Sequence, residues 1–447
     1  MRLLSKYVLI PLLEKRANGS TSKCQKELER TQWLPRDELK QLQEARLQRL
    51  LKHAYKNVPY YQSLFDEEGL KPGDIRTTED LRKLPILTKD NVRRNFNELV
   101  AQNYDKNQMK IASTGGTTGE PLKFYVPRDR GQSWGALWRG LHWYGFEPGD
   151  KWAEIWSHPF KETILTNMSQ KLSQLLRRFI FLSAFELTEG QMQLFAYRIK
   201  KFKPRYLIAY PSAAYILAEY IKQQSIDITS LRVVVTTAEK LYDYERETIK
   251  ETFGCDVFEY YGGGEVLSMA YECPEHHGLH ISAENVILEI VRDDGQPSHP
   301  GEMGRIVVTD LNNYAMPFIR YENGDLGILS AIDCPCGRGL PLLESVEGRI
   351  ADVIVTKDGF ISSPILTTIF KNLRVRQYQI TQESGEEIFI KIMKGEGYSQ
   401  EDTDYIVNTM HQYVGDDMRI QIQFVDSIPL TMAGKRRVVI SKVPLKF

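Results

Sequence analysis

The stretch CDVFEYYGGGE, residues Cys255–Glu265, decides the fold of this chain. It is a run of β-branched and aromatic residues, typical of a strand, that ends in a glycine turn and an acid. Two similar runs precede it, YLIAY (Tyr206–Tyr210) and LRVVVTTAEKL (Leu231–Leu241), and a helical run at residues 213–222 separates these two. This alternation of strands and helices predicts an α/β fold with a mainly parallel sheet covered by helices.

The segments TTAEKL (Thr236–Leu241) and YYGGGE (Tyr260–Glu265) stand at the ends of two of these expected strands. Ligands of open α/β sheets gather at the carboxyl ends of the strands. We therefore expect both segments to belong to one binding site.

The flanking sequence predicts further parts on both sides of this sheet. Residues 34–61 have an apolar helical face, and Pro59 is expected to end that helix. After Glu265, short strands separated by turns predict a β-rich lobe. Beyond Val346–Phe360 the order strand, helix, strand predicts a small α+β unit. We therefore expect a large N-terminal domain, residues 1–348, and a small C-terminal domain, residues 349–447.

Composition excludes several classes of protein. The 447 residues are 42% hydrophobic and 26% charged, as in a globular protein, and they are too many for one ordinary domain. Lys plus Arg and Asp plus Glu number 58 each, which argues against nucleic acid as a partner. The sequence shows no apolar run of membrane-spanning length and no cleavable leader, so we expect a cytoplasmic protein with at most peripheral membrane contact.

A glycine-rich stretch, IASTGGTTGEPLKFY (Ile111–Tyr125), runs directly into a strand-like segment. It is not a Walker loop, because no Lys-Ser or Lys-Thr follows Gly119. Its glycines would let backbone N–H groups turn toward an anion, and its threonine hydroxyls would add donors. A phosphate-binding loop is one interpretation, and a solvent-exposed loop of the same composition is the other.

Four further motifs carry charged residues next to turns. Glu265 follows a glycine turn and is a plausible Mg²⁺ ligand, and Asp325 in RYENGDLG is placed to accept ribose hydroxyls. Arg349 in EGRIAD stands at the expected domain junction, and Lys435 lies on the turn of SIPLTMAGKRR. Taken singly, each of these is as well explained by an ordinary solvated turn.

The order of these motifs along the chain resembles the adenylate-forming superfamily, and within it the phenylacetate–CoA ligase and CapK-like branch. The resemblance runs from LKHAYKNVPYYQSLF through LPILTKD to AGKRR. The loop STGGTTGEP is specific for the superfamily when the other motifs follow it. The series GLHI, PGEMGRIVVTDL, MPFIRYENGDLG and CPCGRG points to the branch.

The resemblance implies roles for individual residues in binding ATP. The ATP phosphates would be held by Ser113, Thr114, Gly115, Gly116, Thr117, Thr118 and Gly119. Ala238 and Glu239 match the Gly-Glu pair that lines the adenine pocket, with alanine in place of glycine. Tyr260 and Tyr261 would flank the base and the acyl group.

The remaining roles concern the metal, the ribose and the reacting atoms. By the same resemblance, Glu265 would bind Mg²⁺, and Asp325 and Arg349 would hold the ribose. Lys435 would bridge the acyl carboxylate and the phosphate during adenylation. The small C-terminal domain would be mobile and would swing about residues 350–352 for the second half-reaction.

Two positions depart from the family pattern. The glycine turn usually carries a Thr or Ser before the acid, and Gly264 stands there instead. The hinge position is commonly Asp or Lys, and here it is Ala351. These departures leave a nucleotide-binding protein without turnover as an alternative.

The function that the resemblance implies is ATP-dependent adenylation of a carboxylic acid followed by acyl transfer to coenzyme A. Because CapK-like proteins are associated with surface-polysaccharide assembly, an amine of an amino acid or sugar is the alternative acceptor. A homodimer is possible. The sequence does not indicate which acid is activated.

Five cysteines, an odd number in a long chain, do not indicate a disulfide framework. Cys334 and Cys336 in DCPCGRG form a knuckle that can direct two thiolates at one ion, and ECPEHHGLHI supplies Cys273 and His280. Together they suit a tetrahedral structural Zn²⁺ site. His276 is the alternative histidine, and free thiols are the alternative to a metal site.

The aromatic run SWGALWRGLHWYGF (Ser133–Phe146) has two interpretations. Its rings could line an aryl or acyl pocket, or they could form the apolar face of a core helix. The second interpretation is favoured.

Overall fold

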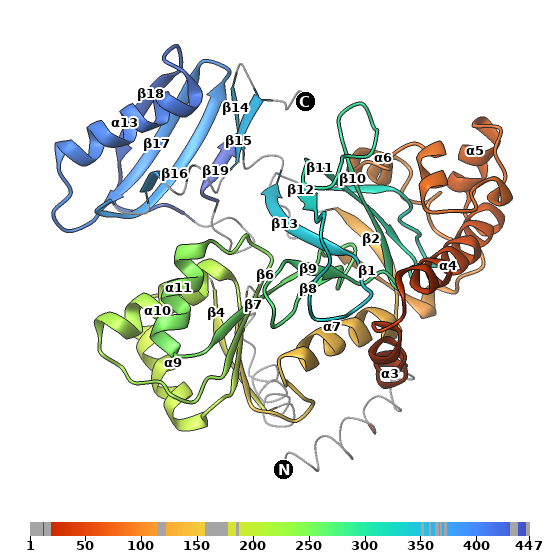
Figure 1. Cartoon of the computed structure of the whole chain (residues 1–447), viewed down its shortest axis with the longest axis horizontal. Coiled ribbons are helices and arrows are strands. Elements are labelled where there is room, and N and C mark those ends of the chain that lie inside the picture. Colours follow the sequence, from red (N-terminus) through yellow and green to blue (C-terminus); the bar gives the residue numbers. More distant parts are fainter. Residues whose placement is uncertain are drawn as a thin grey trace.

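The structure is a computed structural model, and it describes residues 12, 19–113, 122–156, 178–184, 187–349, 353–356, 359–362, 366, 369–370, 373–429 and 437–443. The N-terminal part is helical, with α3 (Thr21–Thr31), α4 (Arg36–Asn57), α5 (Pro59–Glu67) and α6 (Lys89–Arg94). Three short 3-10 helices follow α5 or precede the first strand: η2 (Pro72–Asp74), η3 (Glu79–Lys83) and η4 (Lys106–Gln108). Figure 1 shows α4, α5 and α6 packed together at one end of the molecule.

The expected parallel sheet is present, in the strand order β4–β3–β5–β6–β7. Its strands are β3 (Trp152–Trp156), β4 (Phe179–Ser183), β5 (Tyr206–Ala209), β6 (Val233–Thr237) and β7 (Asp256–Tyr261). The covering helices are α7 (Gly131–Trp143), α9 (Glu189–Phe202), α10 (Pro211–Gln223) and α11 (Asp243–Phe253). Alternate side chains of β6 point to opposite faces, so Val234 packs with α9–α11 while Val233 and Val235 pack with the residues around the end of α7.

The β-rich part continues the same sheet instead of forming a separate one. Its strands are β8 (Ala270–Glu272), β9 (Leu279–Ile281), β10 (Val286–Val291), β11 (Met303–Asp310), β12 (Tyr321–Leu329) and β13 (Leu342–Arg349). They are antiparallel, and β8 pairs with β7, which gives one sheet of eleven strands in the order β10–β11–β12–β13–β9–β8–β7–β6–β5–β3–β4. A separate hairpin of β1 (Met109–Ser113) and β2 (Lys123–Pro127) packs on the core of this half through Phe124 and Val126.

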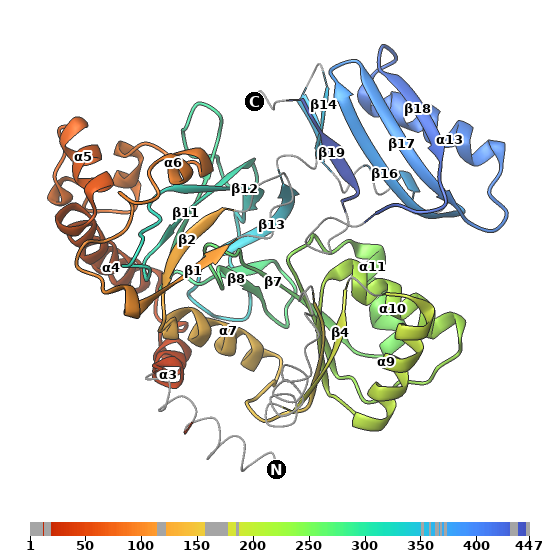
Figure 2. The ribbon, with the colours of Figure 1, turned by 180° about the vertical axis from the view of Figure 1, so that it is seen from behind.

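The residues after β13 form a sheet and core of their own. A hairpin of β14 (Val353–Thr356) and β15 (Gly359–Ser362) precedes a sheet ordered β18–β17–β16–β19. Its elements are β16 (Val375–Ser384), β17 (Glu387–Lys394), α13 (Gln400–Val414), β18 (Arg419–Phe424) and β19 (Val439–Ser441). Ile380, Ile390 and Met410 lie in its buried core. Seen from behind in Figure 2, this part lies beside the eleven-stranded sheet as a separate body.

Pro59 has a different effect from the one expected. The helix that contains Leu47 and Leu50 does end at Asn57, but Pro59 occupies the first turn of a new helix, α5, where its missing N–H costs nothing. The predicted strand, helix and strand of the C-terminal unit are confirmed as β17, α13 and β18. The helices in the described part of the chain are all too short or too polar to cross a bilayer.

Candidate active site

The acid Glu265 lies in the turn that follows β7, and its side chain is buried with 7% of its surface exposed. The Tyr321 hydroxyl, at the start of β12, donates a hydrogen bond of 2.8 Å to the Glu265 carboxylate. Burial, together with this carboxylate, raises the pKa of Tyr321 far above its ordinary value, so the tyrosine remains a donor. The turn is closed by the Gly263 N–H, which donates to the Val266 carbonyl at 2.8 Å.

A second pair of residues joins the end of β7 to β12. The Tyr261 hydroxyl donates to Asp325 Oδ2 at 2.7 Å, and the Asn323 amide donates to the same hydroxyl. The Asn323 side-chain oxygen, Oδ1, also accepts a hydrogen bond of 3.0 Å from the Asp325 N–H, which fixes the turn. Burial raises the pKa of Tyr261 well above its ordinary value, and the Asp325 carboxylate acts in the same direction.

The sheet order explains how these residues meet. Three strands, β8, β9 and β13, separate β7 from β12, but β8 and β9 have only three residues each. The last two residues of β7, Tyr260 and Tyr261, pair with β8, and the Tyr261 side chain reaches β12 through the hydrogen bond of its hydroxyl to Asp325. On the other side of β12, Asp325 is the backbone partner of Arg349, the last residue of β13. The structure thus brings Glu265, Tyr261 and Asp325 into one group and places the Arg349 backbone beside it.

The loop after β6 carries the two residues expected at the adenine pocket. Ala238 has a φ of +71°, a left-handed conformation that is strained for a residue with a Cβ. The Glu239 carboxylate accepts a hydrogen bond of 3.2 Å from the Ser212 N–H in the first turn of α10. Tyr260, at the end of the neighbouring strand β7, stacks on Tyr271 with ring centroids 5.5 Å apart, and burial raises its pKa to about 12.

Some predicted residues cannot be placed in this site. Ser113 ends β1, and its side chain is exposed. Thr114–Gly119 and Lys435 lie outside the described residues, and so do the hinge residues 350–352. Sequence reasoning missed Tyr321 and Asn323. Their position in RYENGDLG, the motif that supplies Asp325, could have indicated that they belong to the site.

The four residues expected to bind a metal do lie together. The nearest ligand atoms of Cys273, His280, Cys334 and Cys336 are all within 4.8 Å of one another. The Cys273 and Cys334 sulfurs are 3.5 Å apart, and Cys336 Sγ lies 3.3 Å from His280 Nε2. His276, the alternative histidine, contacts Glu272 at 2.8 Å instead.

The protonation chemistry of this group fits a metal site in part. His280 Nδ1 faces the Leu340 carbonyl at 3.4 Å, which leaves Nε2 for the centre of the group. Burial lowers the pKa of His280 to about 4, which favours the neutral, ligating form. Burial raises the pKa of Cys273 to about 12, whereas for Cys336 it is outweighed by hydrogen bonds from Arg338, so its pKa is lowered.

The knuckle that carries Cys334 and Cys336 is clamped to the segment after α3. The Arg338 guanidinium carbon lies 4.8 Å from the Trp33 ring and 4.2 Å from the Trp143 ring, between the two aromatic side chains. The Gly339 N–H donates to the Gln32 carbonyl, and a Cβ at Gly339 would stand 1.9 Å from the Leu34 carbonyl oxygen. Arg338 and Gly339 thus join the knuckle to the segment after α3.

The aromatic run at α7 behaves mainly as core. Trp138 packs edge-on against Phe146, and Trp143 packs against Tyr271 and His280. Trp134, in contrast, is 45% exposed. The favoured core interpretation therefore describes this helix better than an acyl pocket does.

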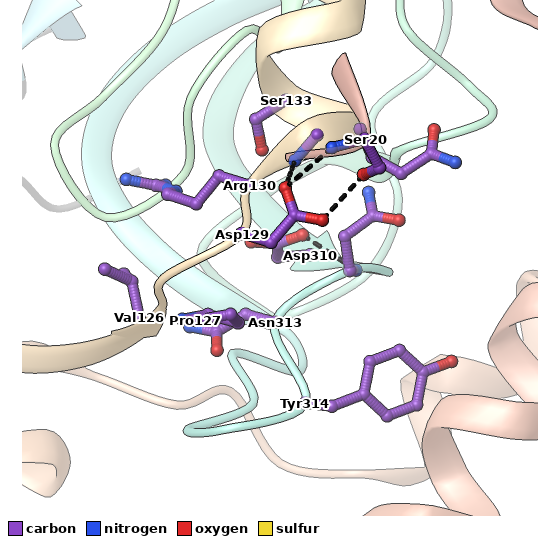
Figure 3. A pocket seen from close by; sticks show the side chains of 12 residues that line it. Ser20, Val126, Pro127, Asp129, Arg130, Ser133, Asp310, Asn313 and Tyr314 are labelled. Carbon is purple, nitrogen blue, oxygen red and sulfur yellow. Dashed lines mark hydrogen bonds between the residues drawn. The ribbon is translucent and has the colours of Figure 1, made fainter. Parts of the chain in front are cut away.

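A cavity of about 260 Å³ lies at the start of α7 and the end of β11 (Figure 3). Asp129 at its rim accepts hydrogen bonds from the Ser20 hydroxyl at 2.7 Å and from the Gly131 N–H at 3.0 Å. Arg130 and Asp310 also line it, and the predicted site residues are absent from the described residues around it. The cavity is therefore distinct from the group around Glu265.

Residues 353–442 match the family described as the CapK C-terminal domain. The phenylacetate-coenzyme A ligase of Escherichia coli (strain K12) is 30% identical over 331 residues, which cover 72% of this chain and 73% of that protein. Protein CapK of Staphylococcus aureus is 22% identical over 422 residues, which cover 91% of this chain and 90% of that protein.

Solved structures share the fold across nearly the whole length. A 2-hydroxyisobutyryl-CoA ligase, in the postadenylation state with R3-HIB-AMP, superposes with a TM-score of 0.74 at 18% identity. The superposition covers 92% of this chain and 91% of that one. Both the parallel half and the C-terminal part are included in a match of this extent.

Proposed function

The chain belongs to the phenylacetate–coenzyme A ligase family of adenylate-forming ligases, and we propose that it adenylates a carboxylic acid and transfers the acyl group to coenzyme A. The observation that carries the proposal is the hydrogen-bonded group of Glu265, Tyr321, Tyr261 and Asp325. It stands where the carboxyl end of β7 meets β12, and it presents two acids whose orientations are fixed by tyrosine hydroxyls.

In the first half-reaction, the carboxylate of the acid attacks the α-phosphorus of ATP and pyrophosphate leaves. The loop Ser113–Gly119 would hold the phosphates, and Lys435 would neutralise the charge that builds on the transferred group. Asp325 and Arg349 would hold the ribose hydroxyls, and Ala238, Glu239 and Tyr260 would enclose the adenine.

Glu265 fits the role of the Mg²⁺ ligand. It is a buried carboxylate held by one tyrosine hydroxyl, and Mg²⁺ prefers carboxylate oxygens. When bound, the ion would offset negative charge on the phosphates. Tyr321 fixes the orientation of the carboxylate, so that it is preorganised for that role.

In the second half-reaction, the thiol of coenzyme A attacks the activated carbonyl and AMP leaves. The acyl-adenylate must be protected from water until then, which a closing C-terminal domain would provide. The sheet and core of residues after β13 support such a movement, because they pack as their own unit.

Zn²⁺ held by Cys273, His280, Cys334 and Cys336 is proposed as a structural ion. The set gives three sulfurs and one imidazole, with three of the four residues buried, and structural zinc sites use this donor set. The contacts of the knuckle with the N-terminal segment support a holding role for this ion.

An amine is the second candidate acceptor. The observation that favours it is the match of residues 353–442 to the CapK C-terminal domain, together with the near-complete coverage of Protein CapK. The C-terminal domain closes over the acyl group in the second half-reaction, so its type bears on the acceptor. In this variant an amino acid or sugar amine attacks the carbonyl and an amide forms.

The test of adenylation is acid-dependent exchange of labelled pyrophosphate into ATP, across aryl, fatty, amino and uronic acids. Exchange with one class of acid is expected, and Lys435→Ala is expected to abolish it. Coenzyme A and amines are then added separately, and the thioester or amide is identified by mass spectrometry. A folded chain that binds ATP and exchanges with no acid would support the non-catalytic alternative raised by Gly264 and Ala351.

A further inference from the structure

We propose that the ion pair between Lys240 and Glu347 is a clasp that positions the two sides of the nucleotide site, an inference that rests on the proposed function. Lys240 Nζ lies 2.7 Å from Glu347 Oε2, within hydrogen-bond distance. The two residues are 107 positions apart in the sequence. Lys240 lies in TTAEKL and Glu347 in EGRIAD, but the family resemblance assigns neither side chain a contact with the nucleotide.

Lys240 belongs to the loop that would enclose the adenine. It follows Ala238 and Glu239 directly, and Glu239 is itself held by the Ser212 N–H at 3.2 Å. Lys240 also lies close enough to Glu259 on β7 to influence that carboxyl electrostatically. A displacement of Lys240 would therefore move the adenine side of the site.

Glu347 belongs to the strand that would hold the ribose. It lies on β13, two residues before Arg349, whose backbone pairs with Asp325. The strands β9, β8 and β7 stand between β13 and β6 in the sheet. No backbone pairing between β6 and β13 therefore fixes the two sides of the site, and the Lys240–Glu347 pair connects them directly.

The burial of this pair distinguishes it from ordinary surface pairs. The Lys240 and Glu347 side chains are 17% and 11% exposed, whereas the exposed pair Lys222–Glu251 has 60% and 71%. A pair with little exposure is weakly screened, but its desolvation cost offsets much of its contribution to stability. Although the pair adds little to stability, it fixes the position of Lys240 relative to Glu347. A nucleotide site requires such a fixed geometry.

The experiment must therefore separate the contribution of the pair to stability from its contribution to nucleotide binding. Lys240→Met alone leaves the Glu347 charge partly buried without a partner, so it is expected to affect both stability and binding. The double variant Lys240→Met/Glu347→Leu removes both charges, so its unfolding temperature should remain near that of the unmodified chain. Lys240→Arg keeps the charge and the pair.

The measurement is the Kd for AMP by calorimetry on the full chain, with thermal unfolding in parallel. We expect both methionine variants to bind AMP at least about tenfold more weakly, and Lys240→Arg to stay within about threefold. Where an acid supports exchange, the KM for ATP should rise with a smaller change in kcat. Glu27→Gln, which weakens the part-buried pair with Arg46 between α3 and α4, is the control and should leave the Kd unchanged.

An unchanged AMP affinity in the double apolar variant would overturn the clasp and leave the pair a structural contact. AMP binding without exchange for any acid would count against the proposed function alone, because the comparison of Kd values needs no reaction. An unmodified chain that binds no adenine nucleotide would overturn both.

Discussion

At the scale of the single residue, Ala238 is held in a conformation that its side chain disfavours. Its φ of +71° costs an L-residue about 1 kcal/mol or more, and glycine adopts it freely. Ala238→Gly is therefore expected to raise the free energy of unfolding by about 0.5–1 kcal/mol, measured by urea denaturation. Ala45→Gly, at an exposed position inside α4, should instead lower it by about 1 kcal/mol. A lower free energy of unfolding in Ala238→Gly would show that the Ala238 backbone is not strained.

Glu265 is the residue whose charge the proposed reaction needs most. Glu265→Gln keeps the shape and the hydrogen bond from Tyr321 but removes the negative charge, so pyrophosphate exchange should fall on the order of 100-fold. The measurement is exchange over a range of Mg²⁺ concentrations, because a lost ligand should raise the Mg²⁺ requirement. Asp294→Asn, an exposed acid beyond the site, is the control. Normal exchange at low Mg²⁺ in Glu265→Gln would exclude this role.

The sequence predicted residues of the site better than it predicted their partners. Glu265 and Asp325 follow glycine turns in recognisable motifs, so both could be predicted as site residues from the sequence. Tyr321 and Asn323 were missed because a tyrosine or asparagine becomes a partner only through the register of β12 against its neighbours. The left-handed backbone conformation of Ala238 could not be predicted either, since alanine is not a residue type that indicates this conformation.

At the scale of the element, the cysteine knuckle is a joint between the sheet and the N-terminal helices. Cys336→Ser is expected to abolish binding of one Zn²⁺ per chain and to lower the free energy of unfolding by more than about 3 kcal/mol. Metal content by mass spectrometry and chemical denaturation are the measurements. Cys24→Ser, a buried cysteine outside the group, should retain the metal. Equal metal content in the two variants would contradict the assignment of the ligands.

Elements with a clear period were predictable, whereas their connections were less so. The β-branched runs of β6 and β7 and the strand, helix and strand of β17, α13 and β18 agree with the structure. Pro59 was expected only to end a helix. The fixed φ of proline also suits the first turn of a helix, and Pro59 in fact begins α5. The grouping of Cys273 and His280 with the knuckle was predicted from the residue types and is confirmed, whereas the pairing of β9 with β13 that accompanies it was not predicted.

At the scale of the whole molecule, the half-buried Glu259 makes stability depend on pH. Burial, reinforced by Glu272, raises the pKa of Glu259 to about 8, above the unfolded value of 4.5. Below pH 4.5 Glu259 is protonated in both the folded and the unfolded state, so the free energy of unfolding does not change with pH. Between pH 4.5 and 8 the unfolded state releases the proton first, so the folded state loses stability as the pH rises.

Glu259→Gln removes that dependence. The substitution is expected to stabilise the chain by about 4 kcal/mol at pH 8 and by less than about 1 kcal/mol at pH 5. Urea denaturation of both proteins from pH 5 to 9 gives the difference. Glu247→Gln, at an exposed position on α11, should show no such trend. A difference that does not grow with pH would show that Glu259 is already ionised in the folded chain.

The continuity of the sheet was the feature of the whole molecule that the sequence did not reveal. The change after Glu265 from alternating strands and helices to strands separated by turns was interpreted as a β-rich lobe. It is instead the point at which β7 pairs with β8 and one sheet continues. Strand pattern indicates direction and burial, but the choice of neighbour depends on contacts that form across the whole chain.

That single sheet sets the order in which the chain can fold as it is synthesised. The strands β3 to β7 with helices α9 to α11 are complete once residue 261 has emerged from the ribosome. β9 then waits through β10, β11 and β12 for β13, its partner. Until then the nascent chain exposes an unpaired strand edge, the kind of surface that invites misassembly. A pause in synthesis before residue 349 would therefore prolong the exposure of this edge, and the proposed clasp residue Glu347 arrives with the strand that covers it.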